Sequence, residues 1–116
     1  MSKQDEKTIR VLLKGKPASS GRIRGKVRVI LKEHNKLDPN VEDGEIVVIP
    51  FVTPFDFQFI IKAGAIVTDI GGVTSHVACI ARELGIPCVV ATEKATKLLK
   101  DGMEVIVDGE NGIIYQ

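Results

Sequence analysis

The middle of the chain repeats short apolar runs that are separated by segments of mixed polarity. Residues 45–50, 65–68 and 87–91 consist almost entirely of apolar or β-branched side chains. Short runs of this kind, in which polar residues do not alternate with apolar ones, are typical of strands that are buried on both faces. The three runs therefore predict three strands in the interior of one sheet.

The connections between these runs have the spacing of helices. Four apolar residues at positions i, i+3, i+4 and i+7 lie between the second and third runs: Val77, Ile80, Ala81 and Leu84. They form the apolar stripe of an amphipathic helix, which Gly85 and Pro87 end. Two shorter helices are predicted, one built on Phe55, Phe59 and Ile60 and closed by Gly64, and one over residues 93–100 with Thr92 as its N-cap. Helical crossovers make the three strands parallel, with right-handed connections.

Both ends of the chain add strands in which polar and apolar residues alternate. These strands cover residues 8–13, 26–31, 103–108 and 112–115. The turn at 109–111 joins the last two as a hairpin, whereas 15–21 is predicted as a turn-rich crossing and 32–44 as a polar loop. We expect an α/β domain over residues 8–116, with a central parallel sheet and a second antiparallel layer, after a flexible polar head at residues 1–7.

The length and composition of the chain argue against several classes of protein. The 116 residues suffice for one compact domain, whereas an eightfold βα barrel alone needs roughly 250. A net charge of +1 with 27% charged residues gives no reason to expect nucleic acid or an anionic membrane as a partner. No apolar run approaches the ~20 residues of a membrane span, and the polar head lacks the apolar core of a signal peptide. Because Cys79 and Cys88 do not make a disulfide framework either, we expect a cytoplasmic protein.

Residues 69–76 link the second apolar run to the amphipathic helix and combine features of an anion-binding site. The loop leaves the carboxyl end of a parallel strand, where α/β sheets bind ligands. Gly71 and Gly72 allow backbone N–H groups to approach an anion closely. Thr74 or Ser75 can cap the helix, so that its first N–H groups and its dipole face the same point. The loop lacks the Gly-Lys-Ser/Thr sequence of a nucleotide-binding P-loop.

His76, in the first turn of the predicted helix, adds a candidate nucleophile to the anion-binding features of this loop. An imidazole has an ordinary pKa of about 6.5, so it is mostly neutral and nucleophilic at pH 7. A phosphoryl group on the ring would lie beside the glycine loop, where Thr74 and Ser75 can donate hydrogen bonds to its oxygens. Thr68, at the strand end, can accept a hydrogen bond from the other ring nitrogen and orient the ring. Arg82 lies off that helix face and can meet the phosphate of a docked partner's substrate.

Several of these residues also have a purely structural interpretation. His76 can simply cap a helix, and Gly71-Gly72 can form a tight turn, but their combination in one loop favours chemistry. Cys79 lies three residues from His76 and can share a metal with it; because no second pair of ligands is visible, a buried apolar role is favoured. Asp69 can bind a metal or accept a proton, although bonding to local backbone N–H groups is more common.

Charged and aromatic side chains outside the loop have mainly structural interpretations. Along one strand face, every second residue is basic: Arg22, Arg24, Lys26 and Arg28. Such a face is usually solvated, but it can also guide docking to an acidic partner. The phenylalanines are expected to fill the core or an interface rather than to stack on bases: Phe51, Phe55, Phe57 and Phe59. His34, in a polar loop, is expected at the surface.

One long motif resembles a known signature. Residues 68–87 read TDIGGVTSHVACIARELGIP, which is similar to the phosphohistidine signature of the PEP-utilizing enzymes. That family includes phosphoenolpyruvate (PEP) synthase, pyruvate phosphate dikinase and enzyme I of the sugar phosphotransferase system. The likeness continues at residues 15–29, at Thr53-Pro54 and at residues 105–109, so it covers most of the chain. A motif of this length is highly specific.

The resemblance implies the swivelling β/β/α fold, with three layers, and His76 as the phosphoacceptor. It also implies a domain that moves between an ATP-grasp nucleotide-binding domain and a barrel that binds PEP or pyruvate with Mg²⁺. Neither is present in this chain, so Mg²⁺, ATP and PEP are expected on partner domains, with no metal or cofactor on this one. The sequence departs from the family pattern at Val77, Cys79 and Ala91, where a small residue, an aliphatic residue and a glycine are common. None of these changes removes the nucleophile, although Val77 adjoins it.

Together these features predict the phosphoryl-carrier part of a PEP synthase or pyruvate phosphate dikinase-like system, not a complete enzyme. Phosphate would pass through His76 between a nucleotide site and a pyruvate/PEP site, with Gly71, Gly72, Thr74 and Ser75 forming the phosphoryl pocket. Two alternatives stay open: a carrier for another dikinase-type reaction, and a swivelling docking module that is never phosphorylated. The polar head that begins at Met1 fits either a separate subunit or an excised domain.

Overall fold

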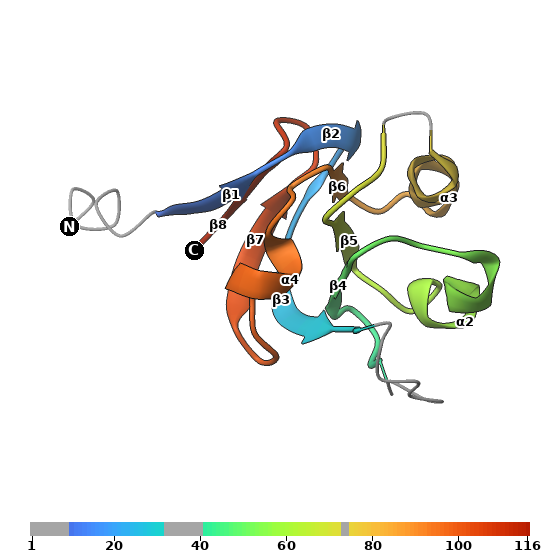
Figure 1. The fold of residues 1–116 in the computed structure, drawn as a ribbon, viewed down its shortest axis with the longest axis horizontal. Coiled ribbons are helices and arrows are strands. Elements are labelled where there is room, and N and C mark those ends of the chain that lie inside the picture. The colour runs from blue at the N-terminus through green and yellow to red at the C-terminus, as the bar shows by residue number, and fades with distance from the viewer. Residues whose placement is uncertain (1–9, 32–40, 73–74) are drawn as a thin grey trace.

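The computed structural model describes residues 10–31, 41–72 and 75–116. Several predicted features lie outside these residues: the polar head, the first residues of the strand predicted at 8–13, most of the loop predicted at 32–44 with His34, and Thr74. The described residues form two packed sheets and a layer of helices (Figure 1). This is the three-layer α/β arrangement that the sequence predicts.

The central sheet is built from the three apolar runs. Its strands β4 (Ile46–Ile49), β5 (Ala65–Thr68) and β6 (Cys88–Val90) lie side by side and run parallel. Every residue in them is buried, as predicted for strands that are covered on both faces. A further strand, β2 (Lys16–Ser19), pairs antiparallel with β6 and forms the edge of this sheet.

The second sheet is antiparallel and contains the predicted hairpin. Its strands are β1 (Val11–Lys14), β8 (Ile113–Tyr115), β7 (Glu104–Asp108) and β3 (Arg22–Val29). β3 joins the two sheets, because residues 22–26 pair antiparallel with β7 whereas residues 27–29 pair parallel with β4. The strand order is therefore continuous, β1-β8-β7-β3-β4-β5-β6-β2, and the consecutive strands β1 and β2 lie at its opposite ends.

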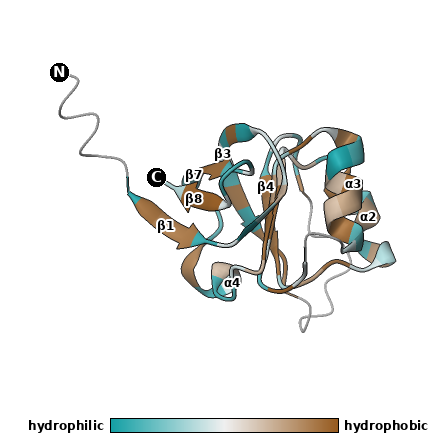
Figure 2. Ribbon diagram, turned by 90° about the horizontal axis from the view of Figure 1, so that it is seen from above, coloured by the Kyte–Doolittle hydropathy of each residue, from teal (hydrophilic) through white to brown (hydrophobic). Residues whose placement is uncertain are grey.

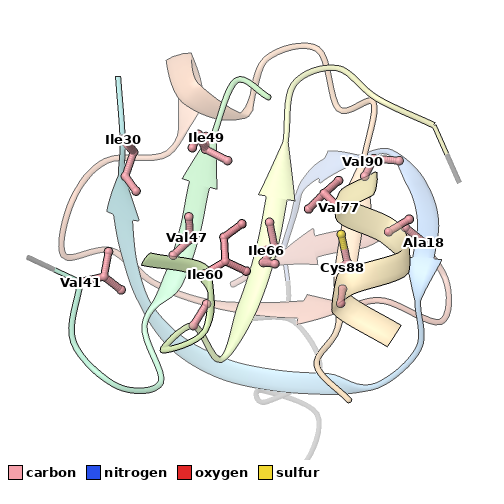
Figure 3. Packing of buried hydrophobic residues seen from close by; sticks show 13 residues of the cluster. Ala18, Ile30, Val41, Val47, Ile49, Ile60, Ile66, Val77, Cys88 and Val90 are labelled. Atoms are coloured by element: carbon pink, nitrogen blue, oxygen red, sulfur yellow. The ribbon is translucent and has the colours of Figure 1, made fainter. Parts of the chain in front are cut away.

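The alternation of side chains along the central strands separates two apolar cores. In β4, Ile46 and Val48 point toward the second sheet, whereas Val47 and Ile49 point toward the helices. The core under the helices also contains Ile30, Val41, Ile60, Ile66, Val77, Cys88 and Val90 (Figure 3). Burial of one such aliphatic side chain contributes about 1.5–3 kcal/mol, so each core holds two neighbouring layers together. The hydrophobic residues accordingly concentrate on strands such as β1, β4 and β8 (Figure 2).

The helical layer covers the outer face of the central sheet. The 3-10 helix η2 (Pro54–Asp56) leads directly into α2 (Phe57–Ile60). Beside α2 lies α3 (His76–Leu84), the predicted amphipathic helix (Figure 1). Its residues Val77, Ala78 and Ala81 are buried, and Gly85 ends it in a left-handed conformation with φ +74°. The prediction of this helix and of its end is therefore confirmed.

Another short helix closes the core between the two sheets. This helix, α4 (Ala95–Leu98), contributes Ala95 to that core, and Leu99 follows it there. It begins later than predicted, although the hydroxyl of Thr92 still accepts a hydrogen bond from the N–H of Ala95 (3.2 Å). Of the helices in the described parts of the chain, none has the length and apolar character needed to cross a membrane.

Two predictions for the first third of the chain are wrong in their boundaries. The segment 15–21, predicted as a crossing, contains the strand β2. Pro17 is compatible with it because an edge strand does not need every N–H group for pairing. The strand predicted at 26–31 begins at Arg22 and ends at Val29, since its first half pairs with the second sheet, a contact that local alternation does not reveal.

Candidate functional site

His76 is the first residue of α3, at the end of the helix that adjoins the loop after β5. Its side chain is exposed. Ser75 precedes it as the N-cap residue, with an extended backbone (φ −69°, ψ 164°). The first N–H groups of a helix have no acceptor within it, and the helix dipole adds positive potential at the same end. The predicted nucleophile therefore lies in an open position where negative charge is favoured.

The loop between β5 and α3 begins at a buried hydroxyl and continues into two glycines. Thr68 is fully buried at the end of β5, and its hydroxyl donates a hydrogen bond to the carbonyl of Ile70 (2.7 Å). Gly71 has φ +131°, a conformation that residues with a side chain rarely adopt. Among the described residues other than its chain neighbours, no atom lies within 4 Å of the place where a Cβ on Gly72 would stand. The described part of the loop therefore does not pack tightly around Gly72.

The hydroxyl groups of this loop bond to its own backbone. The Ser75 hydroxyl donates to the carbonyl of Gly72 (2.6 Å) and makes no capping bond to α3, although Ser75 is the N-cap residue. Among the described residues, no hydrogen bond joins Thr68 to His76. A hydroxyl oxygen that donates one bond can still accept another, so the orienting role of Thr68 and the phosphate-binding role of Ser75 stay predictions.

Phe57 is a residue of this site that sequence reasoning missed. It begins α2, and its ring meets the His76 ring edge-on, with the centroids 5.5 Å apart and the planes at 73°. The sequence predicts only a core or interface role for the phenylalanines. A contact between α2 and α3 depends on how the two helices pack on the sheet, so no spacing along the chain indicates it.

Asp69 connects the loop after β5 with the loop after β6. Its carboxylate accepts hydrogen bonds from the N–H (3.0 Å) and the hydroxyl (2.6 Å) of Thr96. Its carbonyl accepts a further bond from the N–H of Glu93 (2.8 Å). The sequence favours hydrogen bonds from local N–H groups to Asp69. This prediction is wrong, because the donors, Glu93 and Thr96, are distant along the chain. In residues 10–31, 41–72 and 75–116, no cluster of three His, Cys, Asp or Glu side chains could hold a metal ion.

Arg82 lies toward the opposite end of α3 from His76. Its Nε donates a hydrogen bond to the carbonyl of Ala18 in β2 (2.9 Å). The side chain also lines an open cavity of about 470 Å³, together with residues such as Ser19 and Glu110. The structure therefore shows Arg82 joining α3 to the edge strand, and its contact with a partner's phosphate stays a prediction.

The two cysteines differ in exposure and in reactivity. Cys79 is exposed, so the buried apolar role predicted for it is wrong; the buried face of α3 is formed by Val77, Ala78 and Ala81, and residue 79 points away from it. Cys88 is buried in β6, and burial raises the pKa of its thiol to about 12. Cys88 therefore stays protonated at neutral pH and is not a nucleophile.

The predicted basic face follows the whole of β3, but only part of it is free of ion pairs among the described residues. Arg22, Arg24 and Lys26 are exposed. Arg28 instead forms a two-pronged ion pair with Glu45, with both N–O distances at 3.0 Å. This contact, through its hydrogen bond, holds the pKa of Glu45 below its usual value. The exposed part of the stripe can contact an acidic partner, which stays a prediction.

Comparison with known proteins assigns the family. Residues 41–112 match the family model described as PEP-utilising enzyme, mobile domain. A protein of Archaeoglobus fulgidus named probable phosphoenolpyruvate synthase is 52% identical over 107 residues, which are 92% of this chain and 14% of that protein. A rifampicin phosphotransferase of Bacillus cereus is 46% identical over 100 residues, which are 86% of this chain and 11% of that protein.

A solved structure agrees with this assignment. The solution structure of an Enzyme I protein superposes with a TM-score of 0.58 and 39% sequence identity, over 65% of this chain and 31% of that one. The chain thus spans only a small part of the length of the relatives it matches. His76, at the N-terminus of α3, lies within the matched region. The chain belongs to the PEP-utilising enzyme mobile-domain family.

Proposed function

We propose that this chain is a phosphoryl carrier in which His76 is transiently phosphorylated. The observation that supports this most directly is the position of His76, exposed at the N-terminus of α3 and preceded by the open loop at Gly71-Gly72. A phosphoryl group there would meet the positive end of the helix dipole and the N–H groups of its first turn. Ser75 and Thr74 would supply hydroxyl donors once the Ser75 hydroxyl turns away from the carbonyl of Gly72.

The transfer step needs little covalent chemistry from the protein. With PEP as donor, a neutral ring nitrogen of His76 attacks phosphorus, and an N–P bond forms while the bond from phosphorus to the enol oxygen breaks. The leaving enolate takes a proton on carbon and becomes pyruvate. Thr68 would accept a hydrogen bond from the second ring nitrogen and keep the first one aimed at phosphorus. Transfer to the second acceptor breaks the same N–P bond and restores the imidazole.

Both reacting sites would belong to other domains. The chain spans 14% of the PEP synthase relative and 11% of the rifampicin phosphotransferase. We assign the remaining activities to an ATP-grasp nucleotide-binding domain and to a PEP/pyruvate-binding barrel, which would hold ATP, PEP and Mg²⁺. These partners act either in the same longer chain or as separate subunits, with the carrier swivelling between them.

A second candidate function keeps the carrier chemistry but changes the final acceptor. The 46% identity with a rifampicin phosphotransferase supports a dikinase-type reaction on a substrate other than pyruvate. A docking module that is never phosphorylated is the third possibility. It has less support, because such a module has no use for an exposed histidine at an open helix N-terminus.

The carrier role is tested by intact mass spectrometry after the chain is incubated with PEP and Mg²⁺ in an extract of the source organism. The expected result is a mass gain of one phosphoryl group that is lost in acid and kept in base, as for a phosphoramidate. His76→Ala should abolish the gain, and His34→Ala, at the other histidine of the sequence, should keep it. ATP replaces PEP in a parallel reaction, so that labelling from the nucleotide side is also detected.

The absence of any gain from either donor would favour the docking module. That conclusion requires that a known phosphohistidine carrier, added to the same extract, is labelled. If the chain is labelled, removal of the label by pyruvate or by another acceptor separates the PEP synthase-like function from a different dikinase-type function.

A further inference from the structure

The His76 ring is exposed, and Phe57 is the described residue whose ring meets it. The centroid separation of 5.5 Å and the interplanar angle of 73° are those of an edge-to-face aromatic pair. We infer that Phe57 is a positioning residue, which holds the imidazole in the orientation that phosphoryl transfer requires. This inference rests on the proposed carrier function, since it concerns the same histidine.

Phe57 can act in this way because it is itself held on two sides. It follows Asp56, a buried residue whose carboxylate accepts hydrogen bonds from the N–H (2.8 Å) and the hydroxyl (3.0 Å) of Thr53. The carbonyl of Phe57 accepts a bond from the N–H of Ile61 (3.1 Å). The half-buried ring packs against the core under the helices. The surrounding structure therefore holds Phe57 in place where it contacts His76.

An aromatic contact suits a phosphoacceptor better than a hydrogen bond at the same place. An exposed histidine at a helix terminus has several rotamers available, and reaction requires one in which the nitrogen and phosphorus are in line. The edge-to-face contact restricts the rotamer through a ring that has no oxygen or nitrogen of its own. Phe57 therefore offers no oxygen or nitrogen that would compete with the phosphoryl group, or with an oxygen acceptor such as the Thr68 hydroxyl, for the ring nitrogens.

Phe55, two residues before Phe57, provides a matched control for its ring. Phe55 has 85% of its surface exposed and makes no ring contact with His76 in the described structure. It is on the same short helical segment, so it shares the local backbone. The two phenylalanines thus separate an effect on the His76 ring from a general effect of aromatic residues near the site.

The first test is spectroscopic and does not depend on phosphorylation. In wild type, the ring current of Phe57 should displace the proton resonances of the His76 imidazole from their values in a short peptide. Phe57→Leu should remove the displacement, whereas Phe57→Tyr should keep it. Phe55→Leu should keep it as well. Unchanged His76 resonances in Phe57→Leu would overturn the inference, because the contact would then not exist in solution.

The second test measures phosphorylation of His76 in the same extract with PEP, at increasing concentrations of the carrier chain. Phe57→Leu should lower the maximal rate about three- to tenfold with an unchanged half-saturating concentration, since it loosens the ring without changing the docking surface. Phe57→Tyr should restore the wild-type rate. Ile60→Val, which trims a fully buried residue of the same helix α2, controls for loss of stability in this helix.

The outcomes distinguish the inference from the function on which it rests. A wild-type rate in Phe57→Leu, or an equal loss in Ile60→Val, would overturn the positioning role and leave the carrier function in place. If wild type itself takes no label, the carrier function fails and the inference fails with it. If Phe57→Leu slows phosphorylation and loses the ring-current displacement while Phe57→Tyr keeps both, the positioning role is supported.

Discussion

The loop before His76 and the turn between β7 and β8 both carry two glycines, but the glycines serve opposite purposes. In the hairpin turn, a Cβ on Gly109 would overlap the carbonyl oxygen of Ser19, and one on Gly112 would stand 2.6 Å from the carbonyl oxygen of Gly15. In the site loop, a Cβ on Gly71 would stand at ordinary contact distances of 3.7–3.8 Å, and one on Gly72 would meet no described atom within 4 Å beyond its chain neighbours. The glycines of the hairpin turn let backbones pack closely, whereas Gly72 is not required by close packing.

The two segments also differ in the surroundings of one polar side chain in each. The carboxylate of Asp108 at the hairpin turn accepts three hydrogen bonds, two from N–H groups and one from the side-chain amide of Asn111. The site loop instead leads to His76, an exposed side chain whose ring contacts the ring of Phe57 edge-to-face. The hydroxyl groups of Thr68 and Ser75 also bond to their own loop, so the difference lies in His76, which is exposed and which we propose as the phosphoacceptor.

The largest effect is expected from adding a methyl group to the packed turn. Gly109→Ala should lower the free energy of unfolding by about 3 kcal/mol, the upper range for an overpacked site, because the methyl group displaces the backbone of β2. Gly72→Ala is the matched control and should change it by less than about 0.5 kcal/mol. Urea unfolding of both variants measures the difference. Equal losses in the two would remove the distinction between the segments.

The same control variant should show its effect in function. In Gly72→Ala the methyl group enters the space that we assign to the phosphoryl oxygens, so phosphorylation of His76 should slow about tenfold, or about 1.4 kcal/mol in the barrier. The measurement is the rate of the PEP-dependent mass gain, compared with Glu104→Ala, at an exposed residue of β7 in the second sheet. A wild-type rate in Gly72→Ala would show that the phosphoryl group does not occupy this space.

Asp108 provides a pH-dependent test of the packed turn. The side-chain amide of Asn111, with the N–H groups of Asn111 and Glu110, holds the pKa of Asp108 below its usual value. Because the folded-state pKa is lowered, this contribution to stability is fully present above the unfolded pKa of about 3.9 and is lost as pH falls through the folded value. Asp108→Asn should therefore cost about 1 kcal/mol at neutral pH, and the cost should shrink below pH 4.

Urea unfolding of both proteins at neutral pH and near pH 3 checks this expectation. Asp43→Asn, in the exposed turn before β4, is the control and should show no such trend. A cost for Asp108→Asn that is the same at both pH values would mean that the charge of Asp108 does not stabilise the turn.

The sequence predicts the elements whose pattern is local. β5 lies at the predicted residues 65–68, and α3 ends at the predicted Gly85, because a buried strand and an amphipathic helix are specified by their own neighbours. The position of His76 at a helix start followed for the same reason. The strand β2 was missed, since it exists only by pairing with β6, which lies some 70 residues further along the chain.

The contacts of the candidate site were predicted less completely than its position. The ring contact between Phe57 and His76 and the bonds from Asp69 to Thr96 both join segments that meet only when the layers assemble. Cys79 was assigned to the wrong side of α3, because a small apolar residue is compatible with either face and the burial of α3 is set by its packing. Donor and acceptor chemistry can name candidate partners, but the tertiary structure selects among them.

The smallest predicted effect concerns the loop that lies next to the site loop. Ala91 follows β6 with φ +58°, a left-handed conformation that costs an alanine about 1 kcal/mol. Ala91→Gly relieves this cost but adds flexibility to the unfolded chain, so the expected net gain in stability is about 0.5 kcal/mol. Ala95→Gly, in α4, has the opposite sign and should lose about 1 kcal/mol or more. Thermal unfolding compares the two variants, and a loss of stability in Ala91→Gly would show that the strained backbone beside the site is stabilised by its methyl contacts with the core.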